Sequence, residues 1–188
     1  MAETRLWCWR HPPAIGAAGR CIGRTDLAVD PRKAKRLAHR IRTTARRQGL
    51  PREVWASPLR RSRDVGRWLA RWGWRLHIDA RLAELDFGTW DGLPWSSIAW
   101  SEVQAWQDDL LYHAPGGGES LQQLARRAVA FAAEAQAEAE ATSAPRLLVT
   151  HGGWINALLH LPPGCTHLPA AAWPAAPKHA SLTRWPGV

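Results

Sequence analysis

The chain has 188 residues and a mass of 20.9 kDa, which is the size of one domain and is large enough to bury a core without disulfides. Apolar residues make up 46% of it, which excludes wholesale disorder, and no stretch approaches the roughly 20 apolar residues of a membrane helix. The net charge of +9 favours an anionic partner, either nucleic acid, a membrane surface or a phosphorylated small molecule, although an arginine-rich composition would explain it equally well.

The three cysteines, Cys8, Cys21 and Cys165, are widely spaced and include no Cys-x-x-Cys pair. This spacing argues against a disulfide framework and against a zinc site, and it favours a reducing cytoplasm. The first residues lack the cleavage pattern of a secretory signal, so none is expected. The sequence therefore predicts a cytoplasmic protein with no metal and no cofactor.

The first part of the chain alternates short apolar runs with amphipathic segments. Asp30 followed by Pro31 is typical of a helix start, and apolar residues then recur at helical spacing while Arg and Lys fill a face that we interpret as solvated. The predicted elements are a buried strand over 5–9, a loop over 10–31, a helix over 31–47, a strand over 53–56, a helix over 57–72 and an edge strand over 74–78.

The second part begins with an irregular stretch, 83–118, that contains a predicted helix over 94–110. Because apolar strands alternate with helices along the chain, we expect a mostly parallel sheet covered on both faces, a three-layer α/β/α sandwich. The remaining predicted elements are a helix over 119–142, a buried strand over 146–150, a helix over 151–160, a loop over 162–177 and a final strand over 180–185.

Cationic and imidazole side chains follow three of the predicted strands. The strand ends run into Arg10-His11, into residues 57–61 (SPLRR), and into His151-Gly152. Ligands of open α/β sheets bind beyond the carboxyl ends of the strands, and arginine suits bidentate contact with phosphate. The helices that start after 57 and 151 are expected to present free backbone N–H groups to phosphate, with Gly152 allowing close approach.

In this order the motifs resemble the histidine phosphatase (phosphoglycerate mutase-like) superfamily, over about residues 5–160. The resemblance implies a phosphoglycerate mutase-like fold in one domain, 1–188, with a variable, lid-like middle at about 86–118. The motifs that carry it are Arg10-His11, 57–61 (SPLRR), 82–92 (LAELDFGTWDG), 115–120 (PGGGES) and 150–153 (THGG).

The resemblance assigns roles to these residues. His11 would be the nucleophile that becomes phosphohistidine, and Glu84 the general acid and base. Asp86 is the alternative to Glu84, because in an extended segment it would share the same face. Arg10, Arg61 and the catalytic His151, together with Gly152, would bind the phosphoryl group, with Arg60 as the alternative to Arg61. The other histidines are interpreted as structural or surface residues: His39, His77, His113, His160, His167 and His179.

Two features of the loop after the first strand refine the expectation. Residues 19–26 (GRCIGRTD) resemble a pattern of alpha-ribazole phosphatases of cobalamin biosynthesis. Pro12 departs from the usual Arg-His-Gly triplet, and proline lacks a backbone N–H. We therefore expect a metal-independent phosphomonoesterase for a small phosphorylated metabolite, with alpha-ribazole 5′-phosphate as the first candidate and neither a nucleic-acid nor a membrane partner.

Two alternatives remain open. The chain could instead catalyse phosphoryl transfer as a phosphoglycerate mutase, or it could be a non-enzymatic relative that binds phosphate or nucleic acid. The sequence does not indicate the oligomeric state.

Overall fold

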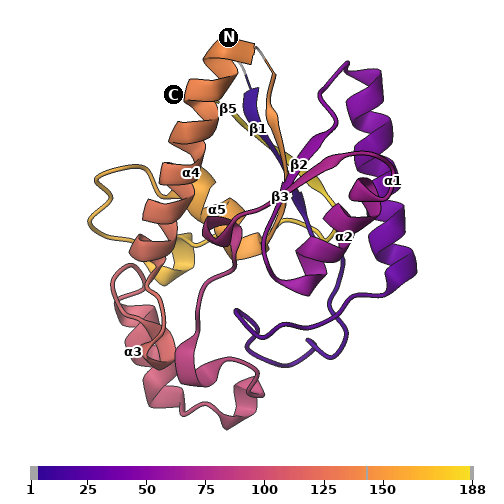
Figure 1. Cartoon of the computed structure of the whole chain (residues 1–188). Coiled ribbons are helices and arrows are strands. Elements are labelled where there is room, and N and C mark those ends of the chain that lie inside the picture. The colour runs from indigo at the N-terminus through magenta and orange to yellow at the C-terminus, as the bar shows by residue number, and fades with distance from the viewer. Residues whose placement is uncertain (1–3, 143, 187–188) are drawn as a thin grey trace.

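A five-stranded sheet runs through the centre of the protein (Figure 1). The computed structural model describes residues 4–142 and 144–186, so the predicted domain ends at 1 and 188 lie outside the described residues. The strand order is β3-β2-β4-β1-β5, in which only β5 runs antiparallel to its neighbour. The strands are β1 (Thr4–Arg10), β2 (Glu53–Ala56), β3 (Arg75–Ile78), β4 (Arg146–Thr150) and β5 (Leu182–Pro186).

Helices cover both faces of this sheet, which confirms the predicted three-layer α/β/α fold. Successive residues of β1 face opposite sides: Trp7 and Trp9 pack with α1 and α2, while Leu6 and Cys8 pack with α4 and α5. Figure 1 shows the two helix pairs on either side of the strands. The helices are α1 (Pro31–Arg47), α2 (Arg60–Ala70), α3 (Trp100–Asp108), α4 (Leu121–Thr142) and α5 (Gly152–His160).

Helix α1 forms as its sequence predicts. The Asp30 side chain accepts a hydrogen bond of 2.7 Å from the backbone N–H of Arg32, and Pro31 occupies the first turn. The apolar stripe is buried, whereas the arginines and lysines of the helix are exposed. The interpretation of that basic face as a solvated surface is therefore confirmed.

Several element boundaries differ from the prediction. Helix α2 begins at Arg60 and not at 57, because the Ser57 hydroxyl accepts from the Leu59 N–H and stabilises a turn there. The predicted helix over 94–110 is a short 3₁₀ turn, Trp95–Ser97, followed by α3, since Ile98 and Ala99 adopt extended backbone angles. Helix α4 begins two residues late, after a reciprocal cap between Ser120 and Gln123.

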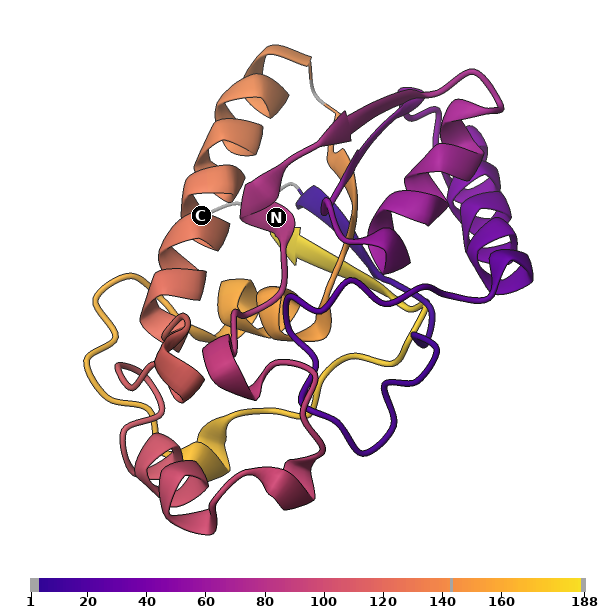
Figure 2. The same cartoon turned by 60° about the horizontal axis from the view of Figure 1, so that its bottom comes forward.

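The irregular middle of the chain lies beyond the carboxyl ends of the parallel strands, beside the loop that follows β1 (Figure 2). The Asp91 carboxylate joins the two by accepting from the backbone N–H groups of Gly23, Arg24 and Thr25 and from the Thr25 hydroxyl. These bonds and burial have opposite effects on the pKa of Asp91, and the bonds lower it overall. Two long loops thus form one structure over the strand ends.

Candidate active site

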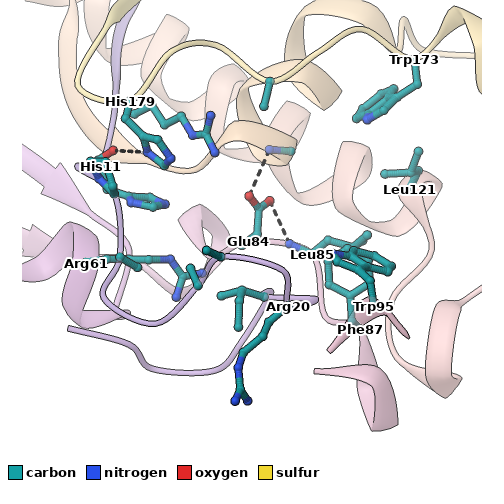
Figure 3. Close-up of a pocket in the computed structure, with 18 of the residues that line it drawn as sticks. His11, Arg20, Arg61, Glu84, Leu85, Phe87, Trp95, Leu121, Trp173 and His179 are labelled. Carbon is teal, nitrogen blue, oxygen red and sulfur yellow. Dashed lines mark hydrogen bonds between the residues drawn. The ribbon is translucent and has the colours of Figure 1, made fainter. Parts of the chain in front are cut away.

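The carboxyl end of β1 and the starts of α2 and α5 line a cavity of ≈ 600 Å³. The side chains that carry its chemistry are His11, Arg10, Arg61 and Glu84 (Figure 3). Arg10 ends β1 and His11 follows it, Arg61 lies in the first turn of α2, and Glu84 follows the 3₁₀ turn Ala80–Leu82. The structure therefore brings four of the predicted site residues to one cavity.

The Nδ1 atom of the His11 ring is hydrogen-bonded, and its Nε2 atom is available to a substrate. Its backbone N–H donates to Thr150 O at 3.0 Å, and its Nδ1 donates to Pro12 O at 2.6 Å. Burial, with smaller contributions from Arg61 and other cationic groups, holds the pKa of His11 well below its usual value, so the ring is neutral. Pro12 keeps the carbonyl that this bond requires. A neutral ring with Nδ1–H presents an Nε2 lone pair, which is the form a nucleophile needs.

Arg61 is almost completely buried, at 1% exposure, with its guanidinium held by a ring nitrogen and backbone carbonyls. Nε donates to His151 Nδ1 at 3.2 Å, Nη1 donates to Thr25 O at 2.8 Å, and Nη2 donates to Gly23 O. Burial lowers the pKa of Arg61, while nearby carboxylates oppose that shift. Arg60 is exposed, so between the two alternatives only Arg61 lies at the cavity.

His151 lies behind the cavity and does not line it. Its ring is fully buried, and its centroid is 5.0 Å from that of His11 in an edge-on arrangement. Burial and then Arg61 hold the pKa of His151 well below its usual value, so its ring is also neutral. In this geometry the His151 ring contacts Arg61 and the His11 ring.

Arg10 is half-buried, and its Nη1 donates to Pro177 O at 2.6 Å. Gly152 starts α5 beside it, and a Cβ added there would lie 3.2 Å from Arg10 Cζ. Burial lowers the pKa of Arg10, and Glu84 opposes the shift. Gly152 therefore gives room to the arginine that faces the cavity.

Glu84 occupies the start of α5. Its carboxylate accepts from the backbone N–H groups of Gly153 at 3.1 Å and Trp154 at 3.2 Å, and also from that of Leu85. A Cβ on Gly153 would meet Glu84 Oε1 at 2.5 Å, so this approach requires glycine. The prediction that the helix start leaves these groups open to phosphate is wrong here, because a carboxylate of the chain itself takes them.

The start of α2 shows the same arrangement. The backbone N–H of Arg60 donates to Asp26 Oδ1 at 2.6 Å. The expectation of an unoccupied phosphate-binding helix start is wrong at this position too. In both helices a positive helix end orients an acidic side chain of the protein.

Arg127 is a residue of the site that the sequence did not indicate. Its guanidinium donates to the carbonyls of Glu84 at 2.9 Å and Arg81 at 2.7 Å, and it pairs with Glu119 at 2.6 Å. Arg127 thereby fixes the backbone that carries Glu84. Asp86 does not line the cavity, because its carboxylate accepts from the Gly88 N–H at 2.8 Å and stabilises a turn. The alternative of Asp86 in the role of Glu84 loses its support.

Aromatic side chains form the outer wall of the cavity. Phe87 meets Trp95 and Trp106 edge-on, with centroid separations of 6.2 and 5.8 Å. Trp173 and Leu121 lie at the same end of the cavity as Phe87 and Trp95 (Figure 3). The cavity is therefore cationic at its inner end and largely apolar at its outer end.

The residues that the structure describes contain no group of three or more His, Cys, Asp or Glu side chains placed to hold a metal ion. None of the helices that the structure describes is long and apolar enough to cross a membrane.

Comparison with known proteins agrees with this arrangement. The glucosyl-3-phosphoglycerate phosphatase of Mycobacterium tuberculosis (strain ATCC 25618 / H37Rv) is 32% identical, with 93% of this chain and 81% of the relative aligned. A probable phosphoglycerate mutase of Yersinia enterocolitica is 34% identical, with 82% and 74% aligned. The native structure of a mycobacterial glucosyl-3-phosphoglycerate phosphatase superposes with a TM-score of 0.76 at 31% identity and covers 96% of this chain and 89% of that one.

These relatives do not support the expected likeness to alpha-ribazole phosphatases. The predicted superfamily and the enzyme class, a phosphatase, are confirmed. The family model of the histidine phosphatase superfamily (branch 1) matches residues 6–184, and the chain belongs to this family.

Proposed function

We propose that the protein is a metal-independent phosphomonoesterase that hydrolyses a small phosphorylated metabolite through a phosphohistidine on His11. The observation that carries the proposal is the protonation, hydrogen bonding and position of the His11 ring. It is neutral, its Nδ1–H is committed to a carbonyl, and it lines a cavity that also holds Arg10, Arg61 and Glu84. A nucleophile, two cations and a carboxylate are the groups that phosphoryl transfer through a covalent intermediate needs.

The first half of the reaction transfers the phosphoryl group to His11. The Nε2 lone pair attacks phosphorus, the ester P–O bond breaks, and Glu84, carrying a proton, gives it to the leaving oxygen. Arg10 and Arg61 stabilise the charge that spreads over the phosphoryl oxygens. His151 supports the transfer through its contacts with Arg61 and with the His11 ring.

The second half regenerates the enzyme. Glu84 takes a proton from a water molecule, the water oxygen bonds to phosphorus, and the P–N bond to His11 breaks. Arg10 and Arg61 stabilise the negative charge of the inorganic phosphate until it leaves the cavity. The start of α5 fixes the Glu84 carboxylate at the cavity, so this one group is placed to serve both steps.

The substrate that we propose is a phosphate ester with a sugar or other ring on its alcohol part. The wall of Phe87, Trp95, Trp106 and Trp173 suits such a ring, because aromatic side chains pack on apolar ring faces. The similarity to glucosyl-3-phosphoglycerate phosphatases makes glucosyl-3-phosphoglycerate the first candidate. Arg20 also lines the cavity, but its Nη1 donates to Gly92 O at 2.9 Å, so contact with the carboxylate of this substrate requires the guanidinium to turn.

The test is phosphate release from a panel of esters in the presence of EDTA. The panel contains glucosyl-3-phosphoglycerate, alpha-ribazole 5′-phosphate, 3-phosphoglycerate and p-nitrophenyl phosphate. We expect release that EDTA leaves unchanged, loss of all activity in His11→Ala, and normal activity in the exposed control His167→Ala. Activity retained in His11→Ala would overturn the mechanism, and a preference for 3-phosphoglycerate, whose alcohol part carries no ring, would overturn the proposed substrate class.

Phosphoglycerate mutase activity is the second candidate, because the Yersinia relative carries that name. It predicts that label from 3-phosphoglycerate appears in 2-phosphoglycerate faster than in inorganic phosphate. We expect the opposite order, since the apolar outer wall leaves few groups to retain a small, highly charged product for re-transfer.

A further inference from the structure

His179, which was predicted to be a structural or surface residue, lies beside the proposed nucleophile. Its Nδ1 donates to the backbone carbonyl of His11 at 3.0 Å, and the two ring centroids are 5.4 Å apart. The ring lines the same cavity (Figure 3). With His151 at 5.0 Å on another side, the His11 ring is flanked by two further imidazoles.

The backbone around His179 is held in an unusual conformation. Ala180 has φ of 58°, the only positive value among the non-glycine residues that the structure describes. This geometry lets the Ala180 N–H donate to Arg10 O at 3.0 Å, and Arg40 of α1 secures the Ala180 carbonyl at 3.0 Å. Backbone conformations of this kind cost energy and cluster at functional sites, so the strain at Ala180 favours a functional role for the neighbouring His179.

The same segment also holds Arg10, the cavity residue at the end of β1. Arg10 Nη1 donates to the carbonyl of Pro177, two residues before His179. The stretch from 177 to 180 therefore contacts both residues of the Arg10-His11 pair. Its position depends on the antiparallel pairing of β5 with β1, which starts directly after it.

The second ring nitrogen of His179, Nε2, takes no part in the bond to His11 O. Because Nδ1 carries the hydrogen bonded to His11 O, Nε2 bears a lone pair in the neutral ring. We propose that His179 is a third histidine of the phosphate site, whose Nδ1–H fixes the His11 carbonyl while its Nε2 contacts the phosphoryl group of the substrate. This inference rests on the proposed function of the cavity.

Contact with a phosphoryl oxygen requires a proton on Nε2, which the ring takes from solvent as the dianion binds. Partial burial and the Arg10 guanidinium lower the pKa of His179 in the unliganded protein, although its bond to His11 O opposes them. The charged and titratable groups near it include Arg10 and His11, Lys178 on its own segment, and Arg40 from α1. A phosphate dianion adds the negative charge that favours the imidazolium.

Two amide substitutions separate the two functions of the ring. The side-chain nitrogen of His179→Asn lies near the position of Nδ1 and can keep the bond to His11 O, whereas that of His179→Gln lies near the position of Nε2. His179→Ala removes both, and His167→Ala is the matched exposed control. The readouts are the Kd of inorganic phosphate by calorimetry, and kcat and KM with p-nitrophenyl phosphate.

We expect phosphate affinity to fall about tenfold in His179→Ala and in His179→Asn, to be largely retained in His179→Gln, and to be unchanged in the control. In NMR titrations the pKa of the His179 ring should rise when inorganic phosphate is added. Wild-type affinity in His179→Asn would overturn the phosphate contact, as would a ring pKa that phosphate does not move.

The binding readout separates this inference from the proposed function. If the wild-type protein hydrolyses no ester of the panel but the His179 variants still lose phosphate affinity, the inference stands and the proposed function fails. If the wild-type protein hydrolyses esters and every His179 variant matches it in phosphate affinity, the inference fails and the proposed function stands.

Discussion

The inner and outer ends of the cavity are built by different physical means. At the inner end, the polar groups of His11, Arg61 and Glu84 are each bonded to a defined backbone or ring partner. At the outer end, Trp95 and its neighbours are held by edge-on ring packing, and Trp95 remains 40% exposed. The inner end is therefore preorganised for one chemical group, whereas the outer end tolerates differences in ring shape.

The largest effect is expected at the inner end. Arg61→Lys keeps the charge but loses the planar group that donates to His151, Thr25 and Gly23 at once. We expect kcat/KM to fall by about 100-fold or more, as for other losses of a transition-state donor. Steady-state kinetics with p-nitrophenyl phosphate measure this change.

The neighbouring Arg60→Lys is the matched control, because its side chain is exposed. An equal loss of kcat/KM in both variants would show that preorganisation of Arg61 is not the cause. A loss in Arg61→Lys that is accompanied by unfolding at the assay temperature would be recognised from the circular dichroism melting curve.

The next effect concerns pH and stability. His11 and His151 have pKa values well below 6.5 in the folded protein, mainly because of burial, whereas in the unfolded chain they titrate near 6.5. As the pH falls below 6.5, the unfolded state binds protons that the folded state does not, so the free energy of unfolding decreases. The free energy of unfolding should be flat between about pH 7.5 and 8 and fall by about 1.4 kcal/mol per pH unit for each of these histidines below 6.

Urea unfolding between pH 8 and 5 measures this slope. His151→Gln should reduce this slope by the contribution of one proton, about 1.4 kcal/mol per pH unit. His167→Gln, at an exposed position, should leave the slope unchanged. Asp79, Asp91 and Glu134 have pKa values lowered by their hydrogen-bond partners and contribute only at more acidic pH. A slope that His151→Gln does not change would contradict the assignment of a neutral, buried His151.

Part of the inner end could be predicted from the sequence, because His11 and Arg61 follow apolar strands, whereas Glu84 was predicted only from the family resemblance. The strands show clear patterns, and parallel strands place their carboxyl ends together. The net charge of the chain favoured an anionic partner. Only a few arginines line the cavity, however, and those of α1 are solvated. Fold and site were thus predictable wherever local pattern and topology agree.

Partners that lie far away in sequence could not be predicted. The helix start at Gly153 is occupied by Glu84, 69 residues earlier, and the position of His179 depends on the pairing of β5. The loop motif at 19–26 predicted a likeness to alpha-ribazole phosphatases that the relatives do not support, and the reason is related. Its Gly23 contributes a carbonyl to Arg61 and its Asp26 caps α2, so the motif specifies the scaffold of the phosphate site and not the substrate.

The smallest effect is expected at the outer end, where Trp95→Ala should alter substrate choice more than catalysis. Removing one ring from the wall costs about 1 kcal/mol for a substrate that packs against it, or five- to tenfold in kcat/KM. We expect that loss with p-nitrophenyl phosphate and less than a twofold change with glycerol 3-phosphate, which has no ring. Trp100→Ala is the matched control, because Trp100 is 68% exposed and does not line the cavity. An equal loss with both substrates would mean that the wall supports the inner end, and the contrast between a preorganised and a tolerant end would no longer hold.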